Sequence, residues 1–316
     1  MDVIALGDAM VSFSPPGLLR LEQAAQLEVW PTGAEANAAV ALARLGKRVG
    51  WLSKLPDHPL SRLIVGAVSR HGVDTSRVVW TPEGRTGTLF YERAVPPRPP
   101  RVWYDRKDSA FTTLTASELD WSYLTSARIV LMAGTAPALS AMLQDTTRRI
   151  AEKVRAAGRL FALDVNYRAK LWSPQEAADY FTKLLPLVSI LFCGGRDAER
   201  LFGLRGEPET VARALQERFE IPTVVLTRGP EGAMAMADRP YHARRVPRAT
   251  MVDPVGAGDA FAGGFLCGYL EGGVQRGLDL GAAVGALHCT IVGDFAYVTR
   301  AEVEELLGSE DQEIQR

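Results

Sequence analysis

The sequence contains few cysteines, and their spacing gives no reason to pair them. Three cysteines occur among 316 residues, Cys193, Cys267 and Cys289, and none belongs to a CxxC motif. An odd and scattered set excludes a disulfide framework and does not indicate a zinc site. We therefore expect all three to be reduced and buried.

Long apolar runs and a strong net charge are also missing. No stretch reaches about 18 uninterrupted apolar residues, and no basic region precedes a long apolar segment at the N-terminus, so neither a membrane span nor a signal peptide is predicted. The formal net charge is −1, with 47% apolar and 23% charged residues, which is typical of ordinary globular proteins. We expect a cytoplasmic protein without nucleic-acid or membrane partners.

Two common nucleotide-binding motifs are absent. The P-loop pattern GxxxxGK[ST] occurs nowhere in the chain. The GAG at 256–258 is followed by Phe261 where the dinucleotide fingerprint requires glycine, and it lies near the C-terminus instead of after the first strand. These absences exclude a Walker-type NTPase and a dinucleotide-binding Rossmann domain.

What the sequence does contain is an alternation of short apolar runs with stretches of helical period, which is typical of a layered α/β fold with a mostly parallel sheet. Strands are predicted at 3–6, 49–52, 129–133, 160–164, 190–193 and 223–227. Helices are predicted at 35–45, 60–71, 138–157, 174–184 and 208–218.

Two extended segments, 13–32 and 86–108, interrupt this alternation. The second contains VPPRPPR, and because proline cannot donate to a strand ladder, 96–100 is predicted to be a loop that joins two strands. Together the segments predict a small separate sheet. It would cover ligands bound at the carboxyl edge of the main sheet.

The stretch DPVGAGDAFAGG is the first candidate for chemistry. Gly256, Ala257 and Gly258 precede a predicted helix, whose first amides lack intrahelical acceptors and favour an anion. Asp259 is then either a catalytic base beside that anion site or a helix cap after a simple turn. The two glycines at 263–264 inside the helix predict a close approach by another segment.

Polar residues follow the strand predicted at 160–164. Asp164, Asn166 and Arg168 are spaced by two, so they share one face if the extended conformation continues. They would then gather at the carboxyl end of the sheet, where open α/β folds bind ligands; a merely solvated strand end is the alternative. The glycine-bearing turn TRGPEG, after the strand at 223–227, is by itself a weak indication of a nucleotide contact.

Four motifs together resemble one family. DPVGAGDAFAGGF resembles the C-terminal signature of the ribokinase-like (PfkB) carbohydrate kinases, and PTGAEANAAVALARLG resembles their N-terminal signature. DVNYR and TRGPEGA lie between these two signatures in the order that the family has, so the resemblance covers nearly the whole chain. GAEAN, VWYDRKDSA, LDVNYRAKLW, VDPVGAGD and the late IVGD are most similar to 2-keto-3-deoxygluconate kinases.

The resemblance implies a three-layer ribokinase-like domain over residues 1–316, with a mostly parallel central sheet and a small β-sheet lid. It implies ATP and Mg²⁺, and Asp259 as the base that acts beside the amides of 256–258. Sugar contacts are expected from Gly33, Asn37 and Asp294, with Asp8 and Ser12 as further candidates. Nucleotide contacts are expected from Thr227, Gly229 and Gly232, together with Gly256 and Gly258. We also expect a homo-oligomer that associates through the lid.

The strand RVWYDRK addresses the substrate class. Alternation puts Tyr104 and Arg106 on one face, and Arg168 supplies a second guanidinium. Arginine can hold a carboxylate with paired hydrogen bonds, which favours a sugar acid, most directly 2-keto-3-deoxygluconate converted to its 6-phosphate. A surface role for Arg106, a PfkB kinase for a neutral sugar such as fructose or ribose, and a non-catalytic sugar-binding relative remain alternatives.

The chain departs from the family pattern at three places. Gly194-Gly195-Arg196-Asp197 stands where the family usually has Asn-x-x-Glu, so Asp197 is the carboxylate expected to contact magnesium indirectly, through water. Pro254 stands where many relatives have threonine beside a monovalent cation site, so potassium activation is not carried over. The lid tyrosine of relatives corresponds to Leu89, Phe90 or Tyr91, in a register that the sequence leaves open.

Overall fold

The computed structural model describes residues 1–244, 246 and 249–308. Within them, the largest element is an eight-stranded sheet with the order β14-β13-β12-β11-β10-β9-β1-β4. Six of its strands run parallel: β1 (Val3–Leu6), β4 (Val49–Leu52), β9 (Ile129–Ala133), β10 (Leu160–Asp164), β11 (Ile190–Gly194) and β12 (Thr223–Thr227). Two antiparallel strands extend one edge, β13 (Ala233–Met236) and β14 (Pro240–His242). The mostly parallel α/β sheet is thus confirmed, and the antiparallel edge is an addition to it.

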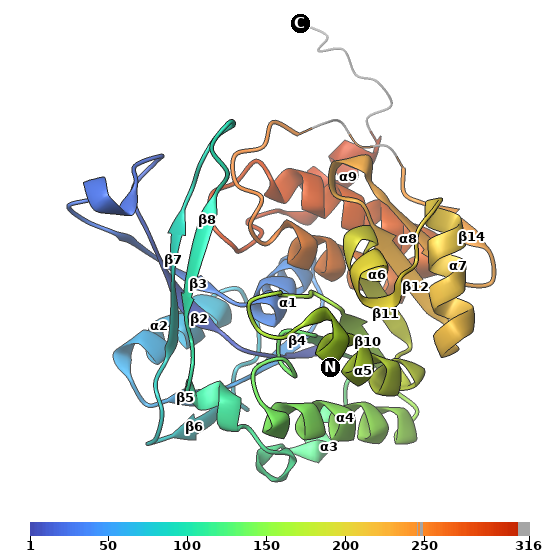
Figure 1. Cartoon of the computed structure of the whole chain (residues 1–316), viewed down its shortest axis with the longest axis horizontal. Helices are drawn as coiled ribbons and strands as arrows, with labels where there is room; N and C mark the ends of the chain where they lie inside the picture. Colours follow the sequence, from blue (N-terminus) through green and yellow to red (C-terminus); the bar gives the residue numbers. More distant parts are fainter. Residues whose placement is uncertain (245, 247–248, 309–316) are drawn as a thin grey trace, which may run out of the picture.

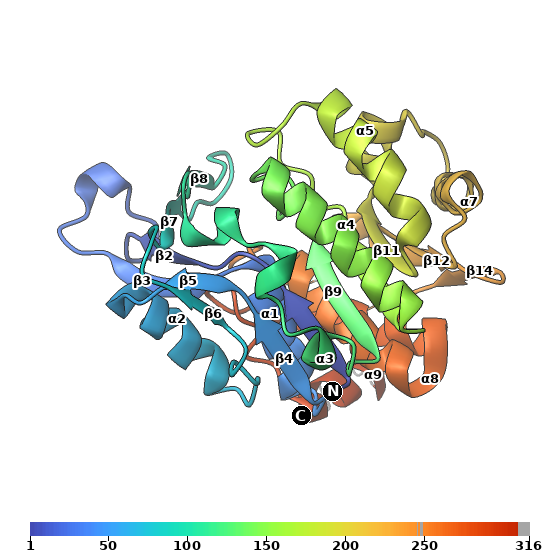
Figure 2. The same cartoon turned by 90° about the horizontal axis from the view of Figure 1, so that it is seen from below.

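Helices cover both faces of this sheet. On one face lie α4 (Ala141–Ala156), α5 (Pro174–Leu184), α6 (Gly195–Phe202) and α7 (Pro208–Phe219); on the other lie α1 (Ala34–Arg44), α8 (Ala257–His288) and α9 (Arg300–Gly308). Figure 2 shows α4 and α5 on one side of the strands and α8 on the opposite side. In β1, Val3 and Ala5 belong to the core under α1 and α8, whereas Ile4 and Leu6 belong to the other core. Strands buried on both faces explain why these segments are continuously apolar in the sequence.

The remaining main-domain elements are short or peripheral: α2 (Pro59–Ser69), α3 (Trp121–Leu124) and a parallel pair, β5 (Lys54–Pro56) and β6 (Val79–Thr81). The predicted helices are found within about three residues of their expected bounds. The largest shift is at α4, which begins at Ala141 because Ser140 is its N-cap and accepts a hydrogen bond from the Leu143 amide at 3.1 Å.

A second sheet of four strands stands beside the main one, at the left of Figure 1, and we call it the lid sheet. Its order is β3-β2-β7-β8, from β3 (Glu28–Thr32), β2 (Met10–Ser14), β7 (Gly87–Glu92) and β8 (Arg101–Asp105). The strands come from both extended segments, although β2 begins three residues earlier than the predicted segment 13–32. The proline-rich stretch forms the loop between β7 and β8, as predicted.

The close approach predicted from the glycine pair at 263–264 is confirmed. A Cβ on Gly263 would lie 2.8 Å from the Ala38 carbonyl oxygen in α1, and one on Gly264 would lie 2.8 Å from that of Leu280. The two halves of α8 therefore fold against each other around a break at Gly272 and Gly273, where the helical dihedrals are lost. This packing fixes the start of α8 against α1.

The cysteines are unpaired: Cys193 and Cys267 are buried, as expected, but Cys289 is partly exposed. None of the helices in the described residues combines the length and the apolar character needed to cross a membrane.

Candidate active site

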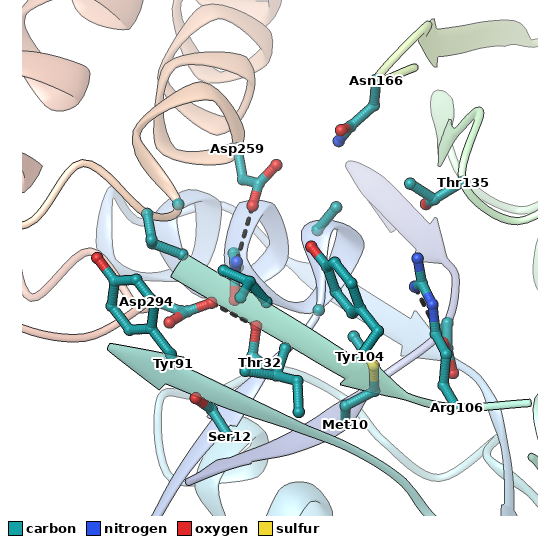
Figure 3. A pocket seen from close by; sticks show the side chains of 18 of the residues that line it. Met10, Ser12, Thr32, Tyr91, Tyr104, Arg106, Thr135, Asn166, Asp259 and Asp294 are labelled. Atoms are coloured by element: carbon teal, nitrogen blue, oxygen red, sulfur yellow. Dashed lines mark hydrogen bonds and ion pairs between the residues drawn. The ribbon is translucent and has the colours of Figure 1, made fainter. Parts of the chain in front are cut away.

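A cavity lies between the carboxyl edge of the main sheet, the start of α8 and the inner face of the lid sheet (Figure 3). The main domain contributes polar groups to it: Asp8, Gly33, Asn37, Thr135, Asn166, Arg168, Gly256, Asp259 and Asp294. The lid strands contribute Met10, Ser12, Thr32, Leu89, Tyr91, Val102 and Tyr104, and Arg106 comes directly after β8. A ligand in this cavity would therefore touch both sheets at once.

The six sugar contacts expected from the sequence all line this cavity: Gly33, Asn37, Tyr104, Arg106, Arg168 and Asp294. The two further candidates, Asp8 and Ser12, line it as well. The lid register is also resolved, because Leu89 and Tyr91 face the cavity while Phe90 packs on Phe13 at 5.7 Å between ring centroids. The residues missed by sequence reasoning include Thr32, Thr135 and Met10, whose types carry no distinctive chemical signal.

The bend before α8 has two backbone amides without an acceptor among the described residues, one fewer than expected. Gly256 is the N-cap of α8 in a left-handed conformation, with φ +84°. The Ala257 amide donates to the Pro254 carbonyl oxygen at 3.3 Å, whereas the amides of Gly256 and Gly258 have no acceptor among the described residues. The prediction that this bend binds a phosphoryl group therefore rests on Gly256 and Gly258 and on the positive end of the helix dipole.

Asp259 projects from the first turn of α8 toward the cavity. Its Oδ2 accepts a hydrogen bond from Asn37 Nδ2 at 2.7 Å, and Asn37 belongs to α1, which packs closely against α8. Burial raises the pKa of Asp259 to about 7, with the carboxylates of Asp164 and Asp294 adding to the rise. A carboxyl that titrates near neutral pH is suited to accept a proton from an alcohol during a reaction.

Asp294 connects the late loop of the chain to the lid sheet. Its Oδ2 accepts a hydrogen bond from the Thr32 hydroxyl in β3, as the dashed line in Figure 3 shows. Burial raises the pKa of Asp294 to about 6, and the nearby Asp253 carboxylate adds to the rise. The cavity thus has an acidic side formed by Asp259 and Asp294.

The opposite side of the cavity holds a buried ion pair between Arg106 and Asp8, with Arg168 as a second guanidinium. Arg106 follows β8 and is 7% exposed; its Nη1 contacts Asp8 Oδ2 at 3.5 Å, and its guanidinium lies 4.7 Å from the Tyr104 ring centroid. Tyr104 and Arg106 therefore share one face, as predicted from alternation. Arg106 Nε is buried and finds no hydrogen-bond partner in the described part of the chain. An anionic or strongly polar ligand in the cavity could supply an acceptor to this donor.

The segment after β10 corrects one expectation. Asn166 has φ 40° and its amide donates to Asp164 Oδ1 at 3.1 Å, so the chain turns after the strand instead of continuing extended. Asn166 and Arg168 line the main cavity, but Asp164 lines a small second cavity behind Asp259. Asparagine tolerates the left-handed region, but the sequence alone does not show that Asn166 adopts this conformation.

Of the expected nucleotide contacts, Gly256 lines the main cavity, whereas Gly258 and the turn residues Thr227, Gly229 and Gly232 are not among its lining residues. Thr227 ends β12, and Gly229 and Gly232 flank a short turn in left-handed conformations with φ 58° and 89°. These glycines allow backbone geometry that other residues avoid, which agrees with a constrained turn. Their contact with a nucleotide stays a prediction.

Asp197 lies in the first turn of α6, partly buried. Burial raises the pKa of Asp197, while the Tyr167 amide and the guanidinium of Arg168 oppose the rise. The described residues contain no group of three or more histidine, cysteine or acidic side chains that could hold a metal ion. Magnesium usually keeps several waters and binds one or two carboxylates plus substrate phosphates, so Asp197 fits an indirect contact.

Glu35 is a buried carboxyl that sequence reasoning did not single out. It lines the small cavity with Asp164 and Asp259, and its Oε1 accepts from the Ala133 amide at 2.8 Å. A Cβ on Gly7 would lie 1.9 Å from the Glu35 carboxyl, so this side chain requires glycine there. Burial raises the pKa of Glu35 to about 8, with Asp259 and Asp8 adding to the rise, so Glu35 is mostly protonated at neutral pH.

Replacing Glu35 by glutamine should stabilise the protein selectively at alkaline pH. The pKa of Glu35 rises from 4.5 to about 8 on folding, so its contribution to stability is most favourable below 4.5 and is lost as the pH rises toward 8. Glutamine is neutral at every pH, so the variant does not lose this stability as the pH rises. Melting temperatures of both proteins at pH 5 and pH 8.5 check this; an equal difference at the two values would contradict it.

Replacing Gly256 by alanine should destabilise the fold and impair the anion site. The left-handed conformation costs a non-glycine residue about 1–2 kcal/mol, and the new Cβ would lie 2.5 Å from the Asp294 carbonyl oxygen. The matched control is Gly258→Ala, whose Cβ would have no neighbour within 4 Å. Thermal unfolding should show a lowered melting temperature for the first variant only; equal melting temperatures would show that the bend is not constrained.

Comparisons with known proteins agree with this geometry. The profile described as pfkB family carbohydrate kinase matches residues 1–312. A 2-dehydro-3-deoxygalactonokinase from Haloferax volcanii is 40% identical over 316 residues, covering 100% of this chain and 99% of the relative. A 2-dehydro-3-deoxygluconokinase from Bacillus subtilis is 32% identical, covering 98% and 96%. The crystal structure of the 2-dehydro-3-deoxygluconokinase from Thermotoga maritima superposes with a TM-score of 0.93 at 30% identity, covering 98% of each chain. The chain belongs to the pfkB family of carbohydrate kinases and has the ribokinase-like fold.

Proposed function

We propose that this kinase transfers the γ-phosphoryl group of ATP to the terminal hydroxyl of a 2-keto-3-deoxy sugar acid. The leading substrate is 2-keto-3-deoxygluconate, which would give the 6-phosphate. Its galacto epimer is included because the relative from Haloferax volcanii is named for that sugar acid. The two acids differ only in the configuration of one hydroxyl, so both carry the same carboxylate.

The observation that carries the proposal is the incomplete pairing of Arg106. A buried guanidinium normally has hydrogen-bond acceptors on its several donors, because an unpaired buried charge is costly. Arg106 has only a 3.5 Å contact with Asp8, and its Nε lacks a partner within the described residues. A substrate carboxylate would supply the missing acceptors with the planar geometry that arginine favours. Arg168 on the same cavity adds a second cation.

The position of Asp259 supports the choice of hydroxyl. Figure 3 shows Arg106 and Asp259 on different sides of the cavity, with Tyr104 between them. A six-carbon acid held by its carboxylate at Arg106 would extend its far end, the C6 hydroxyl, toward Asp259. Asp259 would accept the hydroxyl proton as the oxygen attacks the γ-phosphorus and ADP leaves, while Asn37 holds the carboxylate in place.

The nucleotide would approach from the start of α8. The amides of Gly256 and Gly258 and the helix dipole would stabilise negative charge on the phosphoryl group in transfer. Thr227, Gly229 and Gly232 would contact the rest of the nucleotide. Bound Mg²⁺ would neutralise charge on the β- and γ-phosphate oxygens, with Asp197 holding one of its waters.

The experiment that tests this function is an assay of ADP release over a substrate panel. The panel contains 2-keto-3-deoxygluconate, its galacto epimer, gluconate, fructose and ribose, each with ATP and Mg²⁺. We expect the highest kcat/KM with one or both keto-deoxy acids. Higher kcat/KM with fructose or ribose would identify a neutral-sugar kinase instead. Thermal stabilisation by a sugar without any turnover would identify a non-catalytic binding protein.

Association through the lid sheet stays part of the proposal. Val29 and Trp103 on the lid strands are 43% and 41% exposed, which is high for large apolar side chains on a sheet. We expect a homo-oligomer that Trp103→Glu converts to a monomer, as measured by light scattering coupled to size-exclusion chromatography. A wild-type monomer would contradict this. The cytoplasmic location expected from the sequence also stays a prediction.

A further inference from the structure

Asp253 is a buried carboxylate that precedes the anion site and receives four hydrogen bonds. Its Oδ1 accepts from the Tyr91 hydroxyl at 3.0 Å and from the Val255 amide at 3.2 Å. Its Oδ2 accepts from Arg93 Nε at 3.2 Å and from the Gly293 amide at 3.4 Å. Asp253 is only 1% exposed, so these donors replace water entirely. The carboxylate therefore ties the lid side of the cavity to two loops of the main domain.

The donors on the lid side are fixed to two lid strands. Tyr91 is in β7, and Arg93 follows the end of that strand. Arg93 Nη1 also donates to Glu28 Oε2 in β3 at 3.0 Å, and the guanidinium lies 5.9 Å from the ring centroids of both Trp30 and Tyr91. A displacement of the lid sheet would therefore displace the Arg93 guanidinium with it.

The donors on the main-domain side adjoin residues of the active site. Val255 precedes Gly256 and Gly293 precedes Asp294, and both Gly256 and Asp294 line the cavity. These two segments touch, because a Cβ on Gly256 would lie 2.5 Å from the Asp294 carbonyl oxygen. From behind, His288 Nε2 donates to the Val255 carbonyl oxygen at 2.6 Å. The position of the Asp253 carboxylate thus influences the anion site and Asp294 together.

The positive charge of Arg93 also affects the bend before α8. Asp253 lies three residues before Gly256, so an unbalanced carboxylate there would oppose the binding of a phosphate at the bend. The buried Arg93 guanidinium balances it, and removing one partner of a buried ion pair leaves an uncompensated charge. The amides of Val255 and Gly293 are then held by a carboxylate whose charge is neutralised from the lid.

A ligand in the sugar cavity would act on the same lid strand. Tyr91 lines the cavity with its ring while its hydroxyl donates to Asp253, and Leu89 of the same strand lines the cavity too. We propose that Arg93, together with Tyr91 and Asp253, is a positioning residue that transmits the position of the lid sheet to the anion site. Occupation of the sugar cavity then raises the affinity for the nucleotide. This inference rests on the proposed function.

The test measures the coupling between the two substrates by calorimetry. The dissociation constant of the Mg²⁺ complex of AMP-PNP is determined with and without saturating 2-keto-3-deoxygluconate, or its galacto epimer if that is the better substrate. In the wild type we expect the acid to tighten nucleotide binding by about 5- to 150-fold, the usual range of coupling between sites. In Arg93→Gln the coupling should fall below about twofold, while the acid alone binds within about threefold of the wild type.

Two further variants make the result specific. Arg101→Gln removes an exposed guanidinium from β8 of the same sheet and should keep the wild-type coupling. Tyr91→Phe removes one oxygen from the Asp253 cluster without changing charge, and it should show an intermediate coupling even if Arg93→Gln fails to fold.

The outcomes separate the inference from the proposed function. Unchanged coupling in Arg93→Gln, or in Tyr91→Phe when the first variant does not fold, would overturn the inference while turnover of the acid by the wild type keeps the function. A wild type that turns over the acid without any coupling would also overturn the inference. A wild type that turns over neither acid would refute the function and, with it, the inference.

Discussion

Asp259→Asn should slow phosphoryl transfer by about 10²- to 10⁴-fold, the usual effect of losing a general base. The asparagine side-chain oxygen can still accept the hydrogen bond from Asn37 Nδ2, which is 2.7 Å long in the wild type, so the local packing should persist. What is lost is the capacity to take up the hydroxyl proton. The measurement is kcat at saturating ATP and acid, and the melting temperature together with AMP-PNP affinity serves as the control.

The pH dependence of kcat in the wild type and in Asp259→Asn gives an independent check on the role of Asp259. Burial raises the pKa of Asp259 to about 7, so the carboxyl is protonated and inactive as a base below that pH. In the wild type, kcat should rise as the pH increases through about 7 and level off above it. Asp259→Asn should lack this rise. Wild-type speed in the variant, or the same pH profile in both proteins, would remove Asp259 from the role of base.

Arg106→Ala should raise KM for the sugar acid by about 10- to 150-fold, which corresponds to the 1.5–3 kcal/mol of hydrogen bonding to a charged group. For a neutral analogue, in which the carboxylate is replaced by an amide or a hydroxymethyl group, KM should rise much less. Such an analogue forms no ion pair with the guanidinium, so removing Arg106 costs it little affinity. The measurement is the ratio of the two KM changes. Equal changes would contradict the carboxylate assignment.

Two controls separate this binding effect from a defect in folding. Removing Arg106 leaves Asp8 buried at 4% exposure without its cation, so Asp8→Asn is combined with Arg106→Ala to relieve the stranded charge. The double variant should fold better than the single one while keeping the raised KM. Arg101→Ala on the same lid strand should keep the wild-type KM for both ligands, because Arg101 is exposed outside the cavity.

The main sheet was predictable because its strands are buried on both faces. Five of the six predicted parallel strands have the expected bounds, and β11 extends by one residue, to Gly194. β13 is not among the strands predicted from the sequence. AMAM has little β-branched character, and its strand identity depends on antiparallel pairing with β12.

The lid register and the turn after β10 show the limit of local patterns. Alternation put Tyr104 and Arg106 on one face, but it could not decide among Leu89, Phe90 and Tyr91 until the pairing of β7 with β2 and β8 was known. At Asp164 the assumption of continued extension was wrong, since the Asx-type hydrogen bond to the Asn166 amide turns the chain.

The sequence by itself determined the layered α/β fold, the glycine bend before α8 and Asp259 beside it, because dihedral freedom, apolar period and residue type are local properties. Only the tertiary structure decided which distant groups meet. The pairing of Asn37 with Asp259 joins residues 222 positions apart, and the contact of Arg93 with Asp253 joins residues 160 positions apart. Such pairings depend on the packing of α1 against α8 and of the lid sheet against the late loops, and chain spacing alone contains no information about those distances.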